Sequence, residues 1–467
     1  CALPIWMSVF DGSFWLKGDE GFEEAAVGRV FNGRRPSPAE RRPEAVLFAE
    51  SDEDLIKAVK LAKTNGWSLA MRSGGHSWAA WSVQNGTLLI DMSRLQDATY
   101  DEATGIASAR PAIKGGEVLD PFLEKHGRYF NGGHCPTVAI GGFLLQGGQG
   151  YCARGMGWAA EFVVAVDVLT AEGEIVRCDA NQNQDLYWAA RGAGPSFPGL
   201  VTRFHLQTKP RYKAPHETVQ IFEVDDFKEL MQWIYQVHNE LAPTVELVVV
   251  SNCPIDENGK PGKRIVVVDA LALVDSKEEA EIALAPMRKN PLLHKALVNI
   301  DCGVTTMAER KRQQVEANPE GMRYFVDNIW VDGDTEEIID GIAPLFTDLP
   351  EPRGFTIWFS MGPIRELPDM AFSMQSPGYV ATYLVSEDAS RDVENRAWLN
   401  GAMAGAQSVT VGQYLGDSDM TNRQVKFMAD ENFARLQKVI ADRDPENRFV
   451  RYLAKDPSTV NKNHWQI

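Results

Sequence analysis

The sequence predicts an α+β protein in which two parts of different texture follow each other. Up to about residue 210, helical patterns alternate with short strands and glycine-rich loops, which is typical of mixed α and β layers. From about residue 211 to residue 404, β-branched strand runs dominate, with helices between them. These runs predict a second α+β domain with an antiparallel sheet that is covered on one face.

Composition excludes several classes of partner. The 467 residues are enough for two or three domains, and the formal net charge of −17 argues against nucleic acid or an anionic membrane as a partner. No run reaches the roughly 18 apolar residues that a membrane helix needs. The six cysteines form no CxxC pair, so we expect no metal site and no disulfide framework.

The compartment and the oligomeric state are left open by the sequence. We lean toward a cytoplasmic protein, although one glycosylation sequon at Asn85 leaves secretion possible. A single match of that kind is expected by chance.

The first part contains one well-delimited helix, at residues 52–65. Ser51 is a favourable N-cap, acidic residues fill the first turn, and Asn65-Gly66 is a typical stop. Strands are predicted at residues 68–73 and 87–95. Residues 161–178 predict a hairpin that turns at Glu172-Gly173.

The second part is expected to contain more strands than helices. Strands are predicted at residues 217–224, 245–253, 263–274, 354–362 and 378–388, and helices at residues 225–241 and 276–289. The last sixty or so residues contain the run VGQYLGD (411–417), a predicted helix at 423–443 and a polar tail.

Two glycine-rich loops carry the side chains best suited to chemistry. The first, Ser73-Gly74-Gly75-His76, directly follows a predicted strand, where backbone N–H groups can approach a phosphate. The second holds nine glycines between Gly132 and Gly157, each of which costs backbone entropy on folding, so we infer close contact with a ligand. The spacing is neither GxGxxG nor GxxxxGK[ST], which favours a dinucleotide held by another architecture.

Together, these segments resemble the vanillyl-alcohol oxidase/p-cresol methylhydroxylase flavoproteins, and within them the berberine-bridge-enzyme-like oxidases. MRSGGHS (71–77) is similar to the family's pyrophosphate loop, whose histidine is linked to the flavin 8α-methyl group. GGHCPTVAIGG (132–142) is similar to the second attachment loop, whose cysteine is linked to flavin C6. The resemblance implies FAD that is held covalently through His76 and Cys135.

The resemblance extends to the adenine-side segment at 155–206 and to the family's C-terminal module. It implies a two-part FAD-binding domain, with its N-terminal part at residues 1–212 and a returning segment at 405–467, around a substrate-binding domain at 213–404. The further FAD contacts that it implies are Arg72, Ser73, Gly74, Gly75, Ser77, Thr137, Gly141, Gly142, Gly148, Gly157, Val166, Asn461 and Asn463.

One departure from the family concerns the proton acceptor. Relatives usually carry a Tyr-x-Asn-Tyr/Phe run before the C-terminal helix, and here Val411 stands in the place of its first tyrosine. Removal of a hydride from an alcohol or amine carbon leaves a proton for a group within hydrogen-bond reach. The candidates are Tyr383, Tyr414, Tyr324, Glu246 and His134. Strand packing is the alternative for Tyr383 and Tyr414, and a solvent-facing strand position is the alternative for Glu246. An amine substrate could also lose its proton to water.

The resemblance implies an oxidase whose partners are a small-molecule substrate and dioxygen. An alcohol, a sugar hydroxyl, or a cyclic amine or alkaloid would transfer a hydride to flavin N5, and dioxygen would reoxidise the flavin to give hydrogen peroxide. Aromatic surface for such a substrate is expected from Trp78, Trp81 and Trp358, unless they are core residues. The alternatives are a dehydrogenase with another acceptor, a flavoprotein that has lost catalysis, and a nucleotide-sugar- or phosphate-binding protein without redox activity.

Overall fold

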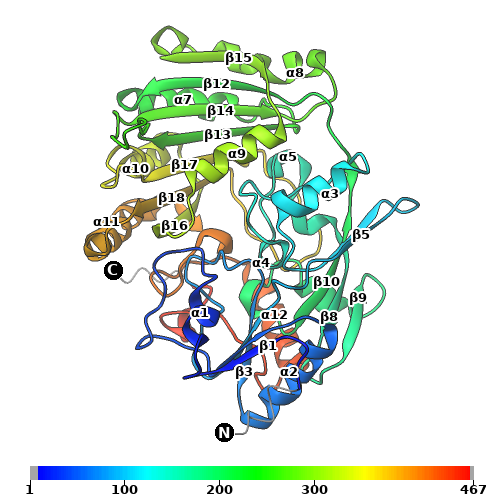
Figure 1. Cartoon of the computed structure of the whole chain (residues 1–467). Coiled ribbons are helices and arrows are strands. Elements are labelled where there is room, and N and C mark those ends of the chain that lie inside the picture. The colour runs from blue at the N-terminus through cyan, green and yellow to red at the C-terminus, as the bar shows by residue number, and fades with distance from the viewer. Residues whose placement is uncertain (1–8, 463–467) are drawn as a thin grey trace.

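The computed structural model describes residues 9–462 and has two stacked α+β lobes (Figure 1). The lower lobe in that view combines the N-terminal part of the chain with most of the C-terminal segment, and the upper lobe is built on one large sheet. The predicted α+β class with an antiparallel second sheet is therefore confirmed. The exact domain boundaries stay predictions.

The first sheet of the lower lobe supports the loop that carries His76. Its order is β1 (Ser13–Leu16), β2 (Ala45–Phe48), β4 (Thr87–Asp91) and β3 (Ser68–Arg72), with β2, β4 and β3 parallel. Helix α1 (Phe22–Val27) and helix α2 (Asp52–Asn65) belong to this layer. The Ser51 side chain accepts a hydrogen bond from the Asp54 N–H, and Gly66 ends α2 at a φ of 69°, which confirms both predicted ends.

The second sheet of the lower lobe has the order β5 (Ala98–Asp101), β6 (Ile106–Ala109), β10 (Leu200–Gln207), β8 (Val163–Leu169) and β9 (Ile175–Asp179). Strands β8 and β9 form the predicted hairpin, in which Gly173 has a φ of 86° and Thr170 N–H donates to Glu174. Short elements complete the layer: α3 (Asp120–Glu124), β7 (Arg128–Tyr129), α4 (Ile140–Leu145), α5 (Ala153–Met156), α6 (Gln184–Ala189) and β11 (Lys209–Pro210).

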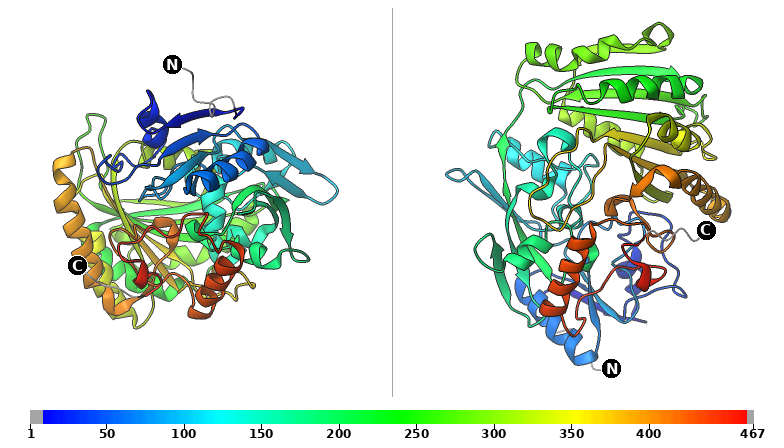
Figure 2. Two further views of the ribbon diagram at one scale, coloured as in Figure 1. Left: turned by 90° about the horizontal axis from the view of Figure 1, so that it is seen from below. Right: turned by 180° about the vertical axis from the view of Figure 1, so that it is seen from behind.

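The large sheet of the upper lobe has eight antiparallel strands. In spatial order they are β15 (Val298–Val304), β12 (His216–Glu223), β14 (Ile265–Ala272), β13 (Val245–Asn252), β17 (Phe355–Ser360), β18 (Gly378–Ser386), β16 (Arg323–Val331) and β19 (Thr410–Gly412). The helices of this lobe are α7 (Phe227–Val237), α8 (Lys277–Leu284), α9 (Met307–Ala317), α10 (Thr335–Thr347) and α11 (Asp392–Gly405). Figures 1 and 2 show α7 and α10 behind the sheet and α9 crossing its other face.

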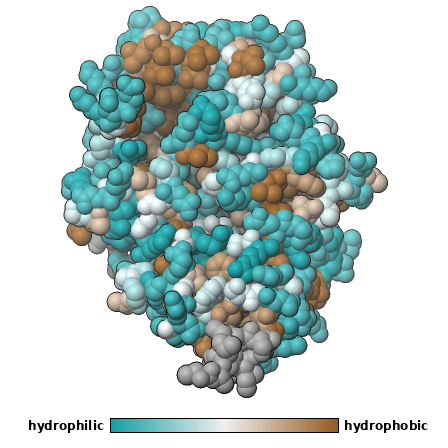
Figure 3. All heavy atoms as spheres, in the orientation of Figure 1, coloured by the Kyte–Doolittle hydropathy of each residue, from teal (hydrophilic) through white to brown (hydrophobic). Residues whose placement is uncertain are grey.

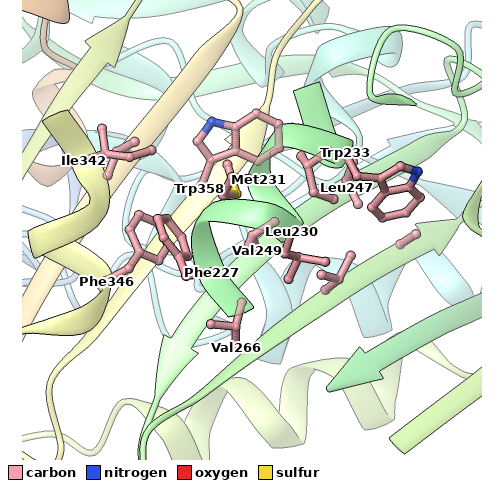
Figure 4. Close-up of a cluster of buried hydrophobic side chains, with 14 of the residues drawn as sticks. Phe227, Leu230, Met231, Trp233, Leu247, Val249, Val266, Ile342, Phe346 and Trp358 are labelled. Carbon is pink, nitrogen blue, oxygen red and sulfur yellow. The ribbon is translucent and has the colours of Figure 1, made fainter. Parts of the chain in front are cut away.

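The main core of the upper lobe lies between the sheet and these rear helices. Apolar residues of α7 recur at helical spacing and pack on the alternate residues Leu247 and Val249 of β13 (Figure 4). Phe346 of α10 stacks on Phe227 with ring centroids 4.5 Å apart. Each large apolar side chain buried here contributes about 1.5–3 kcal/mol. This packing leaves the opposite, even-numbered residues of β13 free to face the lower lobe.

The outer edge of the sheet is apolar and exposed. Strand β15 ends the sheet and carries Val298, Ile300 and Val304, of which Val304 is 80% exposed. Figure 3 shows the corresponding hydrophobic area at the top of the molecule.

The C-terminal segment serves both lobes. Strand β19 pairs with β16 of the large sheet, and helix α12 (Asp430–Arg443) then contacts α6 of the lower lobe. The helix predicted from Arg423 begins later, at Asp430. Residues before it are held extended because Lys426 C=O accepts from Gln413 N–H and Asn461 accepts from the Phe427 and Met428 N–H groups.

Membrane and metal features can be assessed for residues 9–462. Within that range, no helix combines the length and the apolar character needed to cross a bilayer. The same residues contain no cluster of three or more His, Cys, Asp or Glu side chains arranged to bind a metal ion.

Candidate functional site

A cavity of about 400 Å³ lies where the two lobes meet. Its walls come from the loop after β3, the glycine-rich loop around Cys135, residues 194–204, and strands β13, β17 and β18. Residues 194–204 belong to the segment that resembles an adenine-side wall. Loops far apart in the sequence therefore share one cavity.

His76 enters this cavity from the end of β3. Gly75 precedes it with a φ of 77°, and a Cβ there would lie 1.9 Å from Arg29 C=O, so glycine is required for the turn. The His76 ring stacks on Phe31 with centroids 4.3 Å apart. Burial, with a smaller effect of Lys114, lowers the pKa of His76 to about 4, although a hydrogen bond to the Thr137 backbone opposes this. The imidazole is therefore neutral at neutral pH.

Cys135 is a half-buried free thiol in the wall of the same cavity. Its Sγ lies 3.3 Å from Thr137 Oγ1. The two loops pack directly on each other, because a Cβ added to Gly74 would lie 2.9 Å from the Ala139 Cβ. The structure thus brings together the loops of His76 and Cys135.

The other polar groups of the cavity suit a ligand rich in hydrogen-bond acceptors. Trp81 and Gln149 line the wall, and their buried donors Nε1 and Nε2 have no hydrogen-bond partner among residues 9–462. Buried donors in native structures are nearly always paired, so these two require acceptors from a ligand or water. A Cβ on Gly142 would meet no atom within 4 Å. These features fit FAD, whose phosphates and ring carbonyls are acceptors.

Several predicted FAD contacts do line the cavity: Arg72, Ser73, Gly74, Gly75, Ser77, Gly141 and Gly142. Two of these side chains already make hydrogen bonds to other groups of the protein. The Arg72 guanidinium donates to the Asp91 carboxylate and to the Ala25 and Ala26 carbonyls, each at 2.6 Å. Ser77 Oγ accepts from Trp81 N–H at 3.2 Å. Both residues therefore shape the loop.

Other predicted contacts lie away from the cavity wall. Val166 is buried in the core of the second lower sheet, and Gly157 ends α5 at a φ of 104°. Gly148 packs against Phe143 and Ala159. Thr137 does not line the cavity itself, but its hydroxyl contacts Cys135, which does. Asn461 uses its amide on the backbone of Phe427 and Met428. Asn463 lies outside the described residues.

Glu246 and His134 form a hydrogen-bonded pair in the cavity wall. Glu246 Oε1 lies 2.8 Å from His134 Nε2, and its Oε2 accepts from Cys152 N–H at 2.8 Å. The His134 ring contacts Tyr151, with centroids 4.2 Å apart. With Nε2–H donating to the carboxylate, Nδ1 is left as the acceptor.

The three candidate tyrosines are placed differently. Tyr324 donates to Pro319 C=O at 2.7 Å and does not line the cavity. Tyr414 lines it, but its hydroxyl accepts from Gln149 N–H at 3.3 Å, and burial raises its pKa. Burial and then Asp417 raise the pKa of Tyr383, which also lines the cavity. All three phenols are therefore protonated at neutral pH.

Asp417 is a polar wall residue that the sequence did not single out. Its carboxylate accepts from Tyr379 Oη at 2.6 Å and from Trp78 Nε1 at 3.1 Å. The sequence feature that could have pointed to Asp417 is the run Leu-Gly-Asp directly after Tyr414, in which an acidic residue follows a glycine. Asp417 thereby fixes the orientation of Trp78 in the cavity.

The roof of the cavity is apolar. Alternate residues of β13 and β17 point down into it, namely Val248, Val250, Phe355, Ile357 and Phe359. Trp78 and Trp81 add aromatic surface to the cavity. Of the two alternatives, substrate surface and core packing, the first therefore fits these two residues. Trp358 does not line the cavity, because it is buried in the rear core (Figure 4). Its Nε1 donates to Tyr235 Oη.

Comparisons with known proteins agree with this architecture. A family model described as an FAD binding domain matches residues 43–179. The FAD-linked oxidoreductase nodO of Hypoxylon pulicicidum is 35% identical over 93% of this chain and 95% of its own length. The FAD-linked oxidoreductase janO of Penicillium janthinellum is 33% identical over 91% and 93%, respectively.

Solved structures show the same fold. 6-Hydroxy-D-nicotine oxidase from Arthrobacter nicotinovorans superimposes with a TM-score of 0.81 at 22% identity, covering 96% of this chain and 98% of that one. Berberine bridge enzyme from Eschscholzia californica gives 0.79 at 17% identity, covering 96% and 97%.

Proposed function

The chain belongs to the FAD-linked oxidoreductases, and from that premise we propose that it is an oxidase whose flavin is attached through both His76 and Cys135. FAD, when bound, accepts a hydride from the substrate carbon and passes the electrons to dioxygen. One observation carries the double attachment: two nucleophilic side chains 59 positions apart in sequence face the same cavity.

The environments of both side chains support this role. The neutral His76 imidazole keeps a nitrogen lone pair available for bond formation. The Thr137 hydroxyl lies close enough to Cys135 Sγ to stabilise a thiolate, which is the nucleophilic form of cysteine. Stacking on Phe31 fixes the plane of the imidazole.

We propose His134 as the proton acceptor, oriented by Glu246. The Glu246 carboxylate fixes the tautomer and stabilises the imidazolium that forms when Nδ1 takes the substrate proton. Cys152 N–H holds the second carboxylate oxygen, so the pair is rigid. The tyrosines are poorer candidates because a phenol must first lose its proton, and burial of Tyr383 and Tyr414 opposes that loss.

The walls favour an alcohol or amine with an apolar body over a sugar. A sugar presents many hydroxyls and requires matching polar groups, whereas the roof from Val248 to Phe359 offers none. Glu246 and His134 supply polar atoms beside this apolar roof. We therefore propose that the substrate places its hydroxyl or amine at His134 and its apolar part under β13 and β17.

Intact-protein mass spectrometry after denaturation tests the attachment. The wild type should carry the mass of one FAD, and His76→Ala and Cys135→Ala should each keep it through the remaining bond. The double variant should release the flavin. Loss of the covalent flavin from either single variant would disprove double attachment, and a colourless wild type would disprove the proposed function. Comparing reoxidation by air and by a dye then distinguishes an oxidase from a dehydrogenase.

A further inference from the structure

Helix α9 crosses the cavity face of the large sheet (Figures 1 and 2). Met307 is its only buried residue, so apolar packing contributes little to holding it in place. Thr306 caps its N-terminus by accepting from Glu309 N–H. Other interactions must therefore position it.

Ion pairs fasten α9 to both lobes. Arg310 pairs with Glu217 of β12 at 3.0 Å and with Asp269 of β14. Lys311 pairs with Asp120 of α3 in the lower lobe. These groups are largely shielded from water, so the pairs are stronger than exposed ones. One face of the helix is thereby fixed against the cavity.

That face is polar and lines the cavity. Arg310, Gln314 and Asn318 recur every four residues and all contribute to the wall. The opposite face, with Arg312, Gln313 and Glu316, is exposed. Because the spacing selects one face, the position of Gln314 in the wall follows from the anchoring of Arg310.

Two side chains of this wall include polar atoms with no hydrogen-bond partner among residues 9–462. Among residues 9–462, Asp269 Oδ1 is buried and has no hydrogen-bond partner. The Gln314 side chain makes no hydrogen bond to those residues either, and its amide both donates and accepts. A hydroxyl group, itself a donor and an acceptor, satisfies both. A carboxylate does not, because Asp269, Glu217 and Glu246 outnumber Arg310.

We propose that Gln314 and Asp269 form a recognition subsite for a second hydroxyl group of the substrate, distinct from the group that is oxidised. This inference rests on the proposed function for its substrate class, an apolar molecule that bears a hydroxyl or amine. Gln314 and Asp269 are specificity-determining residues, and the ion pairs of Arg310 and Lys311 position them. The substrate is thus an apolar diol or amino alcohol.

Three probes of equal chain length test the subsite: octanol, octanediol with hydroxyls at both ends, and the corresponding ω-hydroxy acid. Their dissociation constants are measured by anaerobic calorimetry on the purified holoenzyme. The wild type should bind the diol about tenfold more tightly than octanol, and the hydroxy acid most weakly. Gln314→Leu should bind the diol and octanol equally.

Gln313→Leu is the matched control, since it makes the same change one residue away on the exposed face. It should keep the tenfold preference, and thermal unfolding of both variants checks the fold. Equal binding of the three probes by the wild type, no binding of the diol, or an unchanged preference in Gln314→Leu would overturn the subsite. Because calorimetry does not depend on turnover, this failure is distinguishable from a protein that lacks covalent flavin.

Discussion

At the residue scale, the cavity separates polar side chains whose hydrogen bonds are complete from those that remain unpartnered. Arg72 looks like a phosphate ligand in the sequence, yet each of its three guanidinium nitrogens already donates to Asp91 or to a backbone carbonyl. Trp81 Nε1 and Gln149 Nε2, by contrast, have no acceptor within the part of the chain that the structure describes. A residue type therefore does not decide a role until its competing partners are known.

The proposed base gives a prediction at this scale. Glu246→Gln and His134→Ala should each slow anaerobic flavin reduction by about 10²–10⁴-fold, since the proton acceptor is mispositioned or lost. Rapid-mixing absorbance with an apolar alcohol or amine that reduces the wild type measures this. Tyr324→Phe serves as the control and should reduce at the wild-type rate. A slow Tyr383→Phe variant beside fast Glu246 and His134 variants would assign the base to the tyrosine instead.

His238 makes stability depend on pH. It is buried beside Ser360, and burial, then Arg154, lower its pKa to about 4. The unfolded chain binds a proton near pH 6.5 while the folded chain does not, so the unfolding free energy falls as the pH drops from about 6.5 toward 4. The loss approaches about 3 kcal/mol.

His238→Gln should flatten this dependence. Thermal midpoints at neutral and mildly acid pH should differ less for this variant than for the wild type. His294→Gln, at an exposed position, should behave like the wild type. An identical acid-induced decrease in all three proteins would show that His238 does not contribute.

At the element scale, the start of α12 shows how tertiary hydrogen bonds limit a helix. Residues 423–429 have helix-compatible composition, but Asn461 and Gln413 engage their backbone. Asn461 itself has a φ of 62°, a conformation that asparagine tolerates better than most residues. A residue predicted as an FAD contact thus holds a backbone segment.

Asn461→Ala should lower the unfolding free energy by about 1–3 kcal/mol, since two buried N–H groups lose their acceptor. Hydrogen exchange at residues 424–429 should rise in the same variant. If exchange there stays at the wild-type rate in Asn461→Ala, the segment is held by other contacts.

At the scale of the whole molecule, the C-terminal segment joins the two lobes. Arg423 forms a buried ion pair with Asp327 of β16, with Nε–Oδ2 and Nη2–Oδ1 distances of 2.5 Å. The same segment then continues to α12 on the lower lobe. Because the pair is buried, removing one of the two side chains leaves the other charge unpaired and lowers the free energy of unfolding.

Asp327→Ala should destabilise the protein by about 3–5 kcal/mol, because the Arg423 charge stays buried. Asp340→Ala removes one partner of an exposed pair with Lys228 and should change stability by less than about 1 kcal/mol. Thermal or urea unfolding measures both. Equal effects of the two substitutions would mean that the pair does not join the lobes.

The sequence by itself determined the α+β class, the ends of α2, the β8–β9 hairpin and the FAD-linked family, because caps, turns and glycine loops are encoded over a few neighbouring residues. Only the tertiary structure decided that Arg72 is hydrogen-bonded within the protein, that Val166 and Trp358 are core, that His134 pairs with Glu246, and that α9 turns Gln314 toward the cavity. Each of these depends on a partner tens to hundreds of residues away. A local sequence pattern does not identify such a partner, because burial and hydrogen bonding are set by the packing of distant segments.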